Sequence, residues 1–219
     1  MVSERTKQAR RRGRPSVDEM PEGERRSDLL RIAASLFRQH GYAAVSVADI
    51  ATVAGVSKST VLHHFGSKEA LYAEIMRTTL LAIGAAVGRI AASADSVPVK
   101  LRAMARDAIV LVDADADLDA MLHDSDEHLS AEPRQAISAT HATIMESVEA
   151  LMREGIVAGV ISDYDPRMLA HAFWHLVAAF AGRRGTQAGY QGRSDVADAV
   201  VELFLHGAAS FSVRLHPVD

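Results

Sequence analysis

The sequence predicts an all-α protein, with an N-terminal three-helix helix-turn-helix domain and a larger C-terminal helical domain. Apolar residues recur at spacings of three and four along most of the chain, and the strict alternation of a half-buried strand is missing. Serine residues precede several apolar runs and glycine residues follow them, which is the usual order of helix start and stop signals. A chain of 219 residues with 48% hydrophobic residues has room for two packed domains.

A basic segment opens the chain, and we assign residues 1–22 to it as a disordered arm. Residues 1–16 contain six Lys or Arg and one acid, for a net charge of +5, whereas the rest of the chain carries −9. The arm has no apolar run, so we expect neither a signal peptide nor a membrane span in it. It also lacks the apolar surface that a core requires.

Within this arm, Arg12-Gly13-Arg14-Pro15 resembles the core of an AT-hook, a short motif that lies in the minor groove of A·T-rich DNA. Narrow A-tract grooves concentrate negative potential, and this potential attracts arginine. Arg12 and Arg14 are therefore candidate DNA contacts. The alternative interpretation is a solvated tail with ordinary attraction to phosphate.

The first helix of the N-terminal domain, which we place at residues 23–70, is predicted by one apolar face. That face consists of Leu29, Ile32, Ala33, Leu36 and Phe37. Gly41 is expected to end the helix. The face is expected to pack on a second set of apolar residues, namely Val47, Ile50, Val56, Val61 and Phe65.

Two short helices are predicted next. Ser46 precedes an apolar run and Asp49 lies three residues after it, a spacing that predicts a capping box at a helix start. Gly55 is expected to end that helix because glycine adopts positive φ readily. Ser57 is expected to cap the next helix, which ends at Gly66.

The surface left exposed on the second short helix indicates DNA binding. Its first turn consists of small hydroxyl side chains and one cation, namely Ser57, Lys58, Ser59 and Thr60. Free N–H groups at a helix start attract phosphate, and hydroxyls hydrogen-bond phosphate or base edges. His63 and His64 extend this donor surface by one turn. The alternative interpretation is a helical hairpin within a core.

This stretch resembles the DNA-binding domain of the tetracycline-repressor (TetR) family of bacterial regulators. The residues that carry the resemblance are Gly41-Tyr42, Ser46, Ile50-Ala51, Ala54-Gly55-Val56-Ser57, Thr60, His64-Phe65 and Ser67-Lys68-Glu69-Ala70-Leu71. The resemblance implies that Ser46, Ser57, Thr60, His63, His64 and Lys68 approach DNA. Two residues depart from the family's usual pattern, because Ser59 stands where Gly is common and Leu62 where Tyr is common. The Tyr usually helps to hold a phosphate, and we expect His63 to supply that contact here.

The remaining residues, 71–219, are predicted to be helical throughout. The expected helices cover residues 68–93, 97–114, 117–129, 133–158, 166–184 and 195–213. Gly155 and Gly159 are expected to end the fourth of these helices, and residues 182–193 to form a polar loop. The family resemblance implies that such a region holds an effector pocket and a two-fold dimer interface.

The last two helices are apolar over more than one stripe, so each must bury a second face. Their small and apolar residues are Ala170, Ala172, Val177, Ala178, Ala179, Ala181, Val196, Ala199, Val200, Leu203, Phe204 and Ala208. Two such helices that meet their symmetry mates form a four-helix interface, and the homodimer places two reading helices on a palindromic operator. The alternative is a bundle that buries both faces within one chain.

Methionine, aromatic and histidine side chains in the C-terminal domain are the candidate lining of the effector pocket. The candidates are Met104, Met121, Leu122, His128, His141, Met145, Phe173, Trp174 and Val177. Such a lining suits an apolar ligand that carries a polar group. The alternative is an ordinary core stripe in which His141 is a satisfied core histidine.

Histidines and acids suggest a divalent metal as an alternative effector. His171 and His175 are four residues apart on one predicted helix, a spacing that lets two imidazoles share a metal. The residues that would complete a Zn²⁺ or Ni²⁺ site are His123, Asp124, Asp126, Glu127 and His128. The alternative is a chance histidine pair and a solvated acidic face, and no cofactor is firmly implied.

The sequence therefore predicts a cytoplasmic, ligand-responsive DNA-binding regulator, a repressor that a small molecule releases from its operator, with no membrane partner. The helix at residues 68–93 joins the reader to the pocket and is the expected lever. The alternatives are a metal-sensing regulator of the same fold, a helical enzyme and an architectural DNA protein. The sequence has no cysteine, no glycine-rich phosphate loop and no nucleophile–base signature in support of an enzyme.

Overall fold

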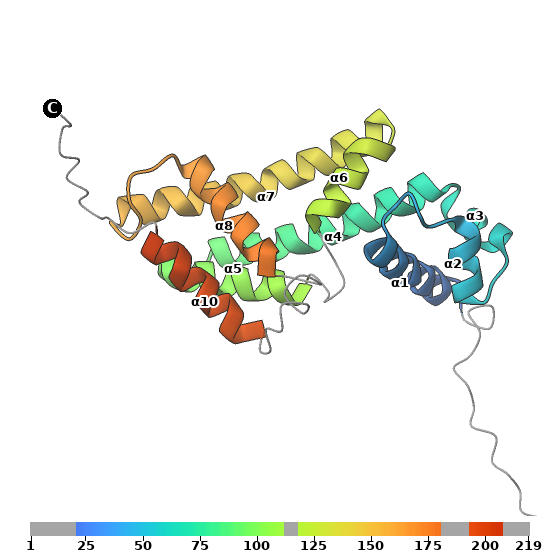
Figure 1. The fold of residues 1–219 in the computed structure, drawn as a ribbon, viewed down its shortest axis with the longest axis horizontal. Coiled ribbons are helices and arrows are strands. Elements are labelled where there is room, and N and C mark those ends of the chain that lie inside the picture. The colour runs from blue at the N-terminus through green and yellow to red at the C-terminus, as the bar shows by residue number, and fades with distance from the viewer. Residues whose placement is uncertain (1–20, 112–117, 181–192, 208–219) are drawn as a thin grey trace, which may run out of the picture.

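The structure is a computed structural model that describes residues 21–111, 118–180 and 193–207, and these residues fold as helices with no strand among them (Figure 1). The all-α prediction is confirmed for this part of the chain. Arg12 and Arg14, the predicted loop over residues 182–192 and the predicted helix ends beyond Leu111, Phe180 and Gly207 lie outside the described residues.

Three helices form the head, which we define as α1 (Glu22–His40), α2 (Val47–Ala54) and α3 (Lys58–Phe65). α1 begins with no side-chain cap, and the acids Glu22 and Glu24 in its first turn complement the positive end of the helix dipole. It ends as predicted at Gly41, whose φ of 80° favours glycine.

The small core of the head is confirmed. The fully or nearly buried members of the two predicted apolar sets are Leu29, Ala33, Phe37, Val47, Ile50, Val61 and Phe65, and the partly buried members are Ile32, Leu36 and Val56. The three helices therefore pack through the residues that the helical spacing selects.

The remaining helices form the body. They are α4 (Lys68–Ala91), α5 (Val97–Leu111), α6 (Leu118–His128), α7 (Ala131–Val157), α8 (Pro166–Phe180) and α10 (Arg193–Gly207). α7 begins two residues earlier than predicted, which leaves Pro133 in its first turn, where a missing N–H removes no intrahelical hydrogen bond.

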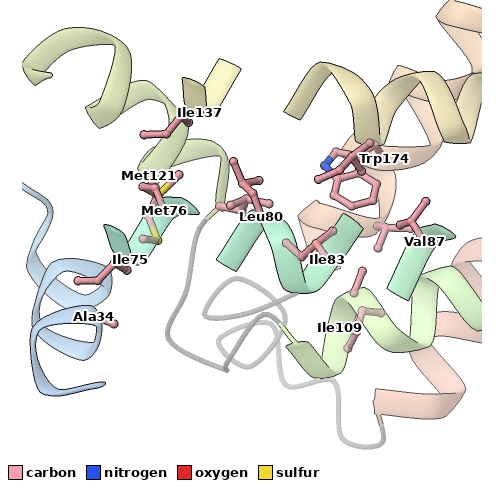
Figure 2. Packing of buried hydrophobic residues seen from close by; sticks show 14 of the residues in the cluster. Ala34, Ile75, Met76, Leu80, Ile83, Val87, Ile109, Met121, Ile137 and Trp174 are labelled. Carbon is pink, nitrogen blue, oxygen red and sulfur yellow. The ribbon is translucent and has the colours of Figure 1, made fainter. Parts of the chain in front are cut away.

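α4 is the central helix of the molecule (Figure 1). α7 lies along it, α1 and α3 pack near its N-terminal end, and α5 packs on it with α8 and α10 beyond. The buried apolar residues form one cluster from Leu29 of α1 to Phe204 of α10, and Figure 2 shows part of it from Ala34 to Trp174. Head and body therefore share one hydrophobic core, which passes through α4.

By length and composition alone, α4 is apolar enough to cross a membrane. One face of it is instead buried among other helices, where Leu71, Met76, Leu80 and Ile83 belong to the common core, while Leu81 on another face is 50% exposed. We interpret α4 as the core helix of a helical bundle.

Gly155 serves packing rather than helix termination, which corrects one prediction. It lies inside α7, and a Cβ at this position would meet Ile161 Cδ1 at 2.7 Å and Val97 Cγ1 at 3.2 Å. The missing side chain lets the turn after α7 fold back on the helix. Gly159, with φ of 70°, lies in that turn, just beyond Val157.

Ion pairs fix one side of α10 against α5. Arg106 Nη2 lies 2.6 Å from Asp198 Oδ2, and Arg102 pairs with Glu202. All four side chains are at least partly exposed, so these pairs contribute little stability and mainly set the rotation of α10. α10 also packs on α8.

Candidate nucleic-acid interface and effector region

The start of α2 is held by the predicted capping box. The Asp49 N–H donates to Ser46 Oγ at 3.2 Å, and the Ser46 N–H donates to Asp49 Oδ2 at 2.8 Å. The Ser46 hydroxyl also donates to Asp49 Oδ2 at 2.6 Å, and these hydrogen bonds from Ser46 lower the pKa of Asp49. Ser46, a predicted DNA contact, is exposed but already engaged in the cap.

α3 presents a cluster of hydroxyls at its first turn. Ser57 Oγ accepts from the Thr60 N–H at 3.0 Å and lies 2.7 Å from Ser59 Oγ and 2.8 Å from Thr60 Oγ1. Ser57, Lys58 and Ser59 are exposed and Thr60 is half-buried, while Val61 and Phe65 hold the other face of α3 in the core. The helix start therefore points small polar side chains and one cation at solvent.

A hollow of about 440 Å³ separates the start of α1 from α3. It is lined by Glu22, Arg25, Ser59, Thr60, His63 and His64. The two imidazole rings pack edge-on at 5.7 Å between centroids, and His63 is the more exposed of the two. Arg25 brings a guanidinium to this surface that sequence reasoning missed, because α1 extends upstream of the apolar face that marked it.

Leu62 has a packing role at the position where the resemblance leads one to expect a phosphate-holding Tyr. Its side chain is partly buried against the common core. It offers no hydrogen-bond donor, so any phosphate contact on this turn falls to its neighbours.

Lys68, another predicted DNA contact, lies at the first position of α4 and is half-buried. Its Nζ lies 4.0 Å from the centroid of the Tyr42 ring, a cation–π contact. Burial lowers the pKa of Lys68, and the nearby Asp124 opposes that shift. The ammonium group is therefore partly engaged within the protein.

α8 and α10 each carry a second apolar face that the described part of the chain does not bury. Met168 is 52% exposed and Leu203 61%, and the small residues Ala172, Ala179 and Ala199 are exposed beside them. On the opposite sides of these helices, side chains such as Val177 and Val200 are buried in the core. An exposed apolar surface on two neighbouring helices is typical of a protein interface.

Most of the predicted effector-lining side chains are packed in the core. The buried ones are Met104, Met121, Met145, Phe173, Trp174 and Val177, and the partly buried ones are Leu122, His128 and His141. His141 and Met145 also line a surface groove of about 430 Å³ between α7 and α8, together with Arg167 and His171.

Two buried nitrogen atoms in this region have no hydrogen-bond partner among the described residues. They are Trp174 Nε1 and His128 Nδ1, and the Trp174 side chain is only 6% exposed. In Figure 2 the Trp174 side chain faces the part of α4 that carries Ile83 and Val87. A buried donor without an acceptor is costly in an apolar core.

The predicted metal site is not formed by the described residues. His171 and His175 stack with ring centroids 6.2 Å apart, and no three His, Asp or Glu side chains in the described ranges are placed to hold one ion. On α6, His123 Nε2 and His128 Nδ1 lie 3.7 and 3.9 Å from Glu127 Oε2, while Asp124 faces the head. The helical spacing is present, but the described part of the chain brings no third ligand to it.

Comparisons with known proteins describe both parts of the chain. A model of bacterial regulatory proteins of the tetR family matches residues 29–75, and a model of a tetracyclin repressor-like C-terminal domain matches residues 94–208. The HTH-type transcriptional repressor KstR2 of Rhodococcus jostii (strain RHA1) is 31% identical to this chain over 198 residues, which cover 90% of this chain and 97% of that protein.

Solved structures share the whole architecture. The TetR family transcriptional regulator PfmR from Thermus thermophilus matches with a TM-score of 0.70 and 28% identity, over 81% of this chain and 97% of that chain. AibR in complex with isovaleryl coenzyme A and operator DNA matches with a TM-score of 0.68 over 81% of this chain and 96% of that chain. At 24% identity, the likeness to AibR concerns the fold alone.

Proposed function

Because this chain belongs to the TetR family of DNA-binding transcriptional regulators, we propose that it is a repressor that leaves a palindromic operator when a small-molecule effector binds its body. The observation that carries the proposal is the exposed first turn of α3, with its hydroxyls and Lys58. The 31% identity with a transcriptional repressor along nearly the whole chain supports the direction of control.

The proposed operator contacts belong to one surface of the head and to the arm. On the head they are Ser46, Ser57, Lys58, Ser59, Thr60, His63 and His64, with Lys68 at the start of α4, and Arg25 joins them through the hollow beside α3. In the arm we propose Arg12 and Arg14 as minor-groove contacts. The corresponding functional units are the arm, the DNA-binding domain (23–70) and the effector and dimerisation domain (71–219). The arm was assigned to residues 1–22, but Glu22 is already the first residue of α1.

The proposed oligomer is a homodimer formed through the exposed faces of α8 and α10. Met168, Ala172, Ala199 and Leu203 supply apolar surface for a four-helix interface around a two-fold axis. Such a dimer presents two copies of α3 to two operator half-sites.

For the effector we propose an apolar molecule that carries a hydrogen-bond acceptor for Trp174 Nε1. By linkage, it must bind the DNA-free form more tightly than the operator-bound form. We propose a regulator that acts in the cytoplasm and performs no catalysis, as its family membership supports.

Selection of bound DNA from a random pool tests the proposal. Full-length protein should enrich an inverted repeat, and native mass spectrometry of the complex should show an even number of protomers. Failure to enrich any sequence at moderate salt would refute operator recognition. Enrichment of a single half-site by one protomer would refute the dimer.

The effector can be found through Trp174, since the chain contains one tryptophan. A compound that binds near Trp174 should shift or quench its fluorescence, and the same compound should weaken operator binding. A compound that changes the fluorescence at saturation but leaves operator affinity unchanged is not the effector. If every compound that occupies this site behaves so, the site does not control DNA binding.

A further inference from the structure

Asp124 of α6, whose sequence context suggested a metal ligand or a solvated acid, is directed at the head. Its Oδ2 accepts a hydrogen bond of 2.9 Å from the backbone N–H of Tyr42, which lies 82 residues away in the chain. Tyr42 is buried, and it follows Gly41 in the corner between α1 and α2. A Cβ at Gly41 would lie 3.6 Å from the same oxygen, so the carboxylate sits directly against this corner.

The charge of the same carboxylate also acts on Lys68. The Lys68 ammonium rests over the Tyr42 ring at 4.0 Å, and the negative charge of Asp124 favours the charged form of this partly buried lysine. Asp124 and Tyr42 therefore form a polar joint that ties α6 to the α1–α2 corner, and Lys68 at the start of α4 rests on the Tyr42 ring of this joint. A charged acceptor in a partly buried place makes a stronger hydrogen bond than a neutral one.

The rest of α6 is attached on the same side. The Tyr72 hydroxyl donates to the Met121 carbonyl at 3.0 Å, and the His128 ring packs on Tyr42 with centroids 5.2 Å apart. Met121, Asp124 and His128 are spaced by three and four residues, so they share one face of α6. Burial, followed by the charge of Asp124, raises the pKa of Tyr72.

This face of α6 also carries members of the proposed effector lining, since Met121 and His128 belong to both sets. The joint thus lies between the proposed effector lining on α6 and the corner between α1 and α2. Without the Asp124 carboxylate, the Tyr42 N–H loses its acceptor.

We propose that Asp124 is a positioning residue that fixes the orientation of the reading head on the body, and so keeps the two heads of a dimer at one operator-compatible separation. The inference rests on the proposed function. A head that is already oriented loses less freedom on binding than one that samples many orientations, so the joint strengthens operator binding although Asp124 is an acid.

The direction in which operator affinity changes when Asp124 is removed distinguishes a positioning role from a purely electrostatic one. If Asp124 acted only as a negative charge near DNA, its removal would strengthen operator binding, and removal of the neighbouring Asp126 would do the same. If Asp124 positions the head, its removal weakens operator binding and removal of Asp126 does not. Asp126 is exposed on the same helix and serves as the matched control.

The experiment measures the separation of the two heads and the operator affinity of full-length variants. The chain has no cysteine, and Val53 on α2 is 60% exposed, so Val53→Cys places one spin label on each head. In the labelled background, Asp124→Ala should broaden or shift the distance distribution between heads. In unlabelled protein, it should weaken operator binding about tenfold, as expected for loss of a hydrogen bond to a charged group.

Asp124→Asn keeps an acceptor for the Tyr42 N–H, so its distance distribution and operator affinity should lie between those of the wild type and Asp124→Ala. This variant keeps the test valid if Asp124→Ala folds poorly. Asp126→Ala should match the wild type in both measurements. Equal distance distributions and operator affinities for wild type and both Asp124 variants would overturn the proposal, as would equal losses in Asp124→Ala and Asp126→Ala.

Hydrogen exchange of the peptide that contains Tyr42 distinguishes failure of this inference from failure of the proposed function. If the spin-labelled protein gives no distance between two heads and the wild type does not bind an operator, the proposed function fails. Faster exchange of that peptide in Asp124→Ala than in Asp126→Ala would then still support the joint, and equal exchange would overturn it.

Discussion

The head and the body are both helical, but they satisfy their polar groups over different distances along the chain. In the head, the Ser46–Asp49 box and the Ser57–Thr60 cap join residues three apart. In the body, buried Lys100 pairs with Glu154 at 3.1 Å across 54 residues, and Asp124 reaches Tyr42 across 82. The caps of α2 and α3 are therefore set locally, whereas these two contacts depend on tertiary packing. Each part also has contacts of the other kind, since Arg26 of the head pairs with Glu74 across 48 residues, and the Met168 N–H of the body donates to Asp165 Oδ1 three residues away.

Substitutions in the head and in the body should therefore have different effects on DNA binding and on stability. Exposed side chains on α3 are proposed to contact DNA and contribute little to folding stability. Their substitution should therefore change operator binding and leave stability nearly unchanged. The proposed effector-lining residues of the body are also core residues, so their substitution should change both. The predictions below test this division, from the largest expected effect to the smallest.

The largest effect is expected in the body core. Phe173 is 1% exposed and packs edge-on against Phe204 with centroids 5.3 Å apart. Phe173→Ala should lower the free energy of unfolding by about 3–5 kcal/mol, because it removes a buried ring and leaves a cavity. Chemical denaturation measures this, with Val157→Ala at an 89% exposed site as the control. Similar losses in both variants would show that Phe173 is not part of a tightly packed core.

The arm should affect DNA binding without affecting the fold. Deletion of residues 1–16 should weaken operator binding and flatten its dependence on salt, by about one unit of log–log slope for each phosphate that the arm neutralises. Replacing Arg12 and Arg14 with alanine, compared with replacing Arg5 and Lys7, removes equal charge from two places. A greater loss of affinity for the first pair on A·T-rich flanks would support the minor-groove contact. An unchanged salt slope after the deletion would remove the arm from the mechanism.

The smallest effect concerns the capping box of α2. Hydrogen bonds from Ser46 keep the pKa of Asp49 below its ordinary value, so the ionised carboxylate stabilises the folded state at neutral pH. That contribution is complete above the unfolded pKa of about 4 and is lost as pH falls through the lower folded pKa. Urea unfolding at several pH values should show wild type more stable than Asp49→Asn at pH 7, and this difference should shrink as pH falls below the unfolded pKa of about 4. A pH-independent difference would show that the charge has no role in the cap.

The head could be predicted in detail because its signals are local. Ser46, Asp49, Gly55, Ser57 and Gly66 each act within one turn of their position in the sequence, and the structure places all five as expected. The start of α1 was missed because Pro21 makes no side-chain cap, so no residue type marks it.

The body could be predicted only as a set of helices. The role of Asp124 was not foreseen, because an acid among other acids has the pattern of a solvated face until α6 is packed against the head. Likewise, Gly155 has the pattern of a helix end, but the Ile161 and Val97 side chains approach it so closely that a Cβ there would force them to shift. The metal interpretation failed for the described residues for a related reason, because helical spacing supplies two ligands and only tertiary structure supplies a third.

The central claim is that α3 of the head binds DNA while the body governs it, and two matched threonines test this most directly. Thr60 lies in the hydroxyl cluster of α3, and Thr143 is an exposed residue of α7 whose hydroxyl donates to its own helix. On the selected operator, Thr60→Ala should weaken binding about tenfold by loss of a hydrogen bond to a charged phosphate, with unchanged stability and dimerisation. Thr143→Ala should bind as the wild type does. Equal operator affinity for the two variants would contradict the assignment of α3 as the reading helix.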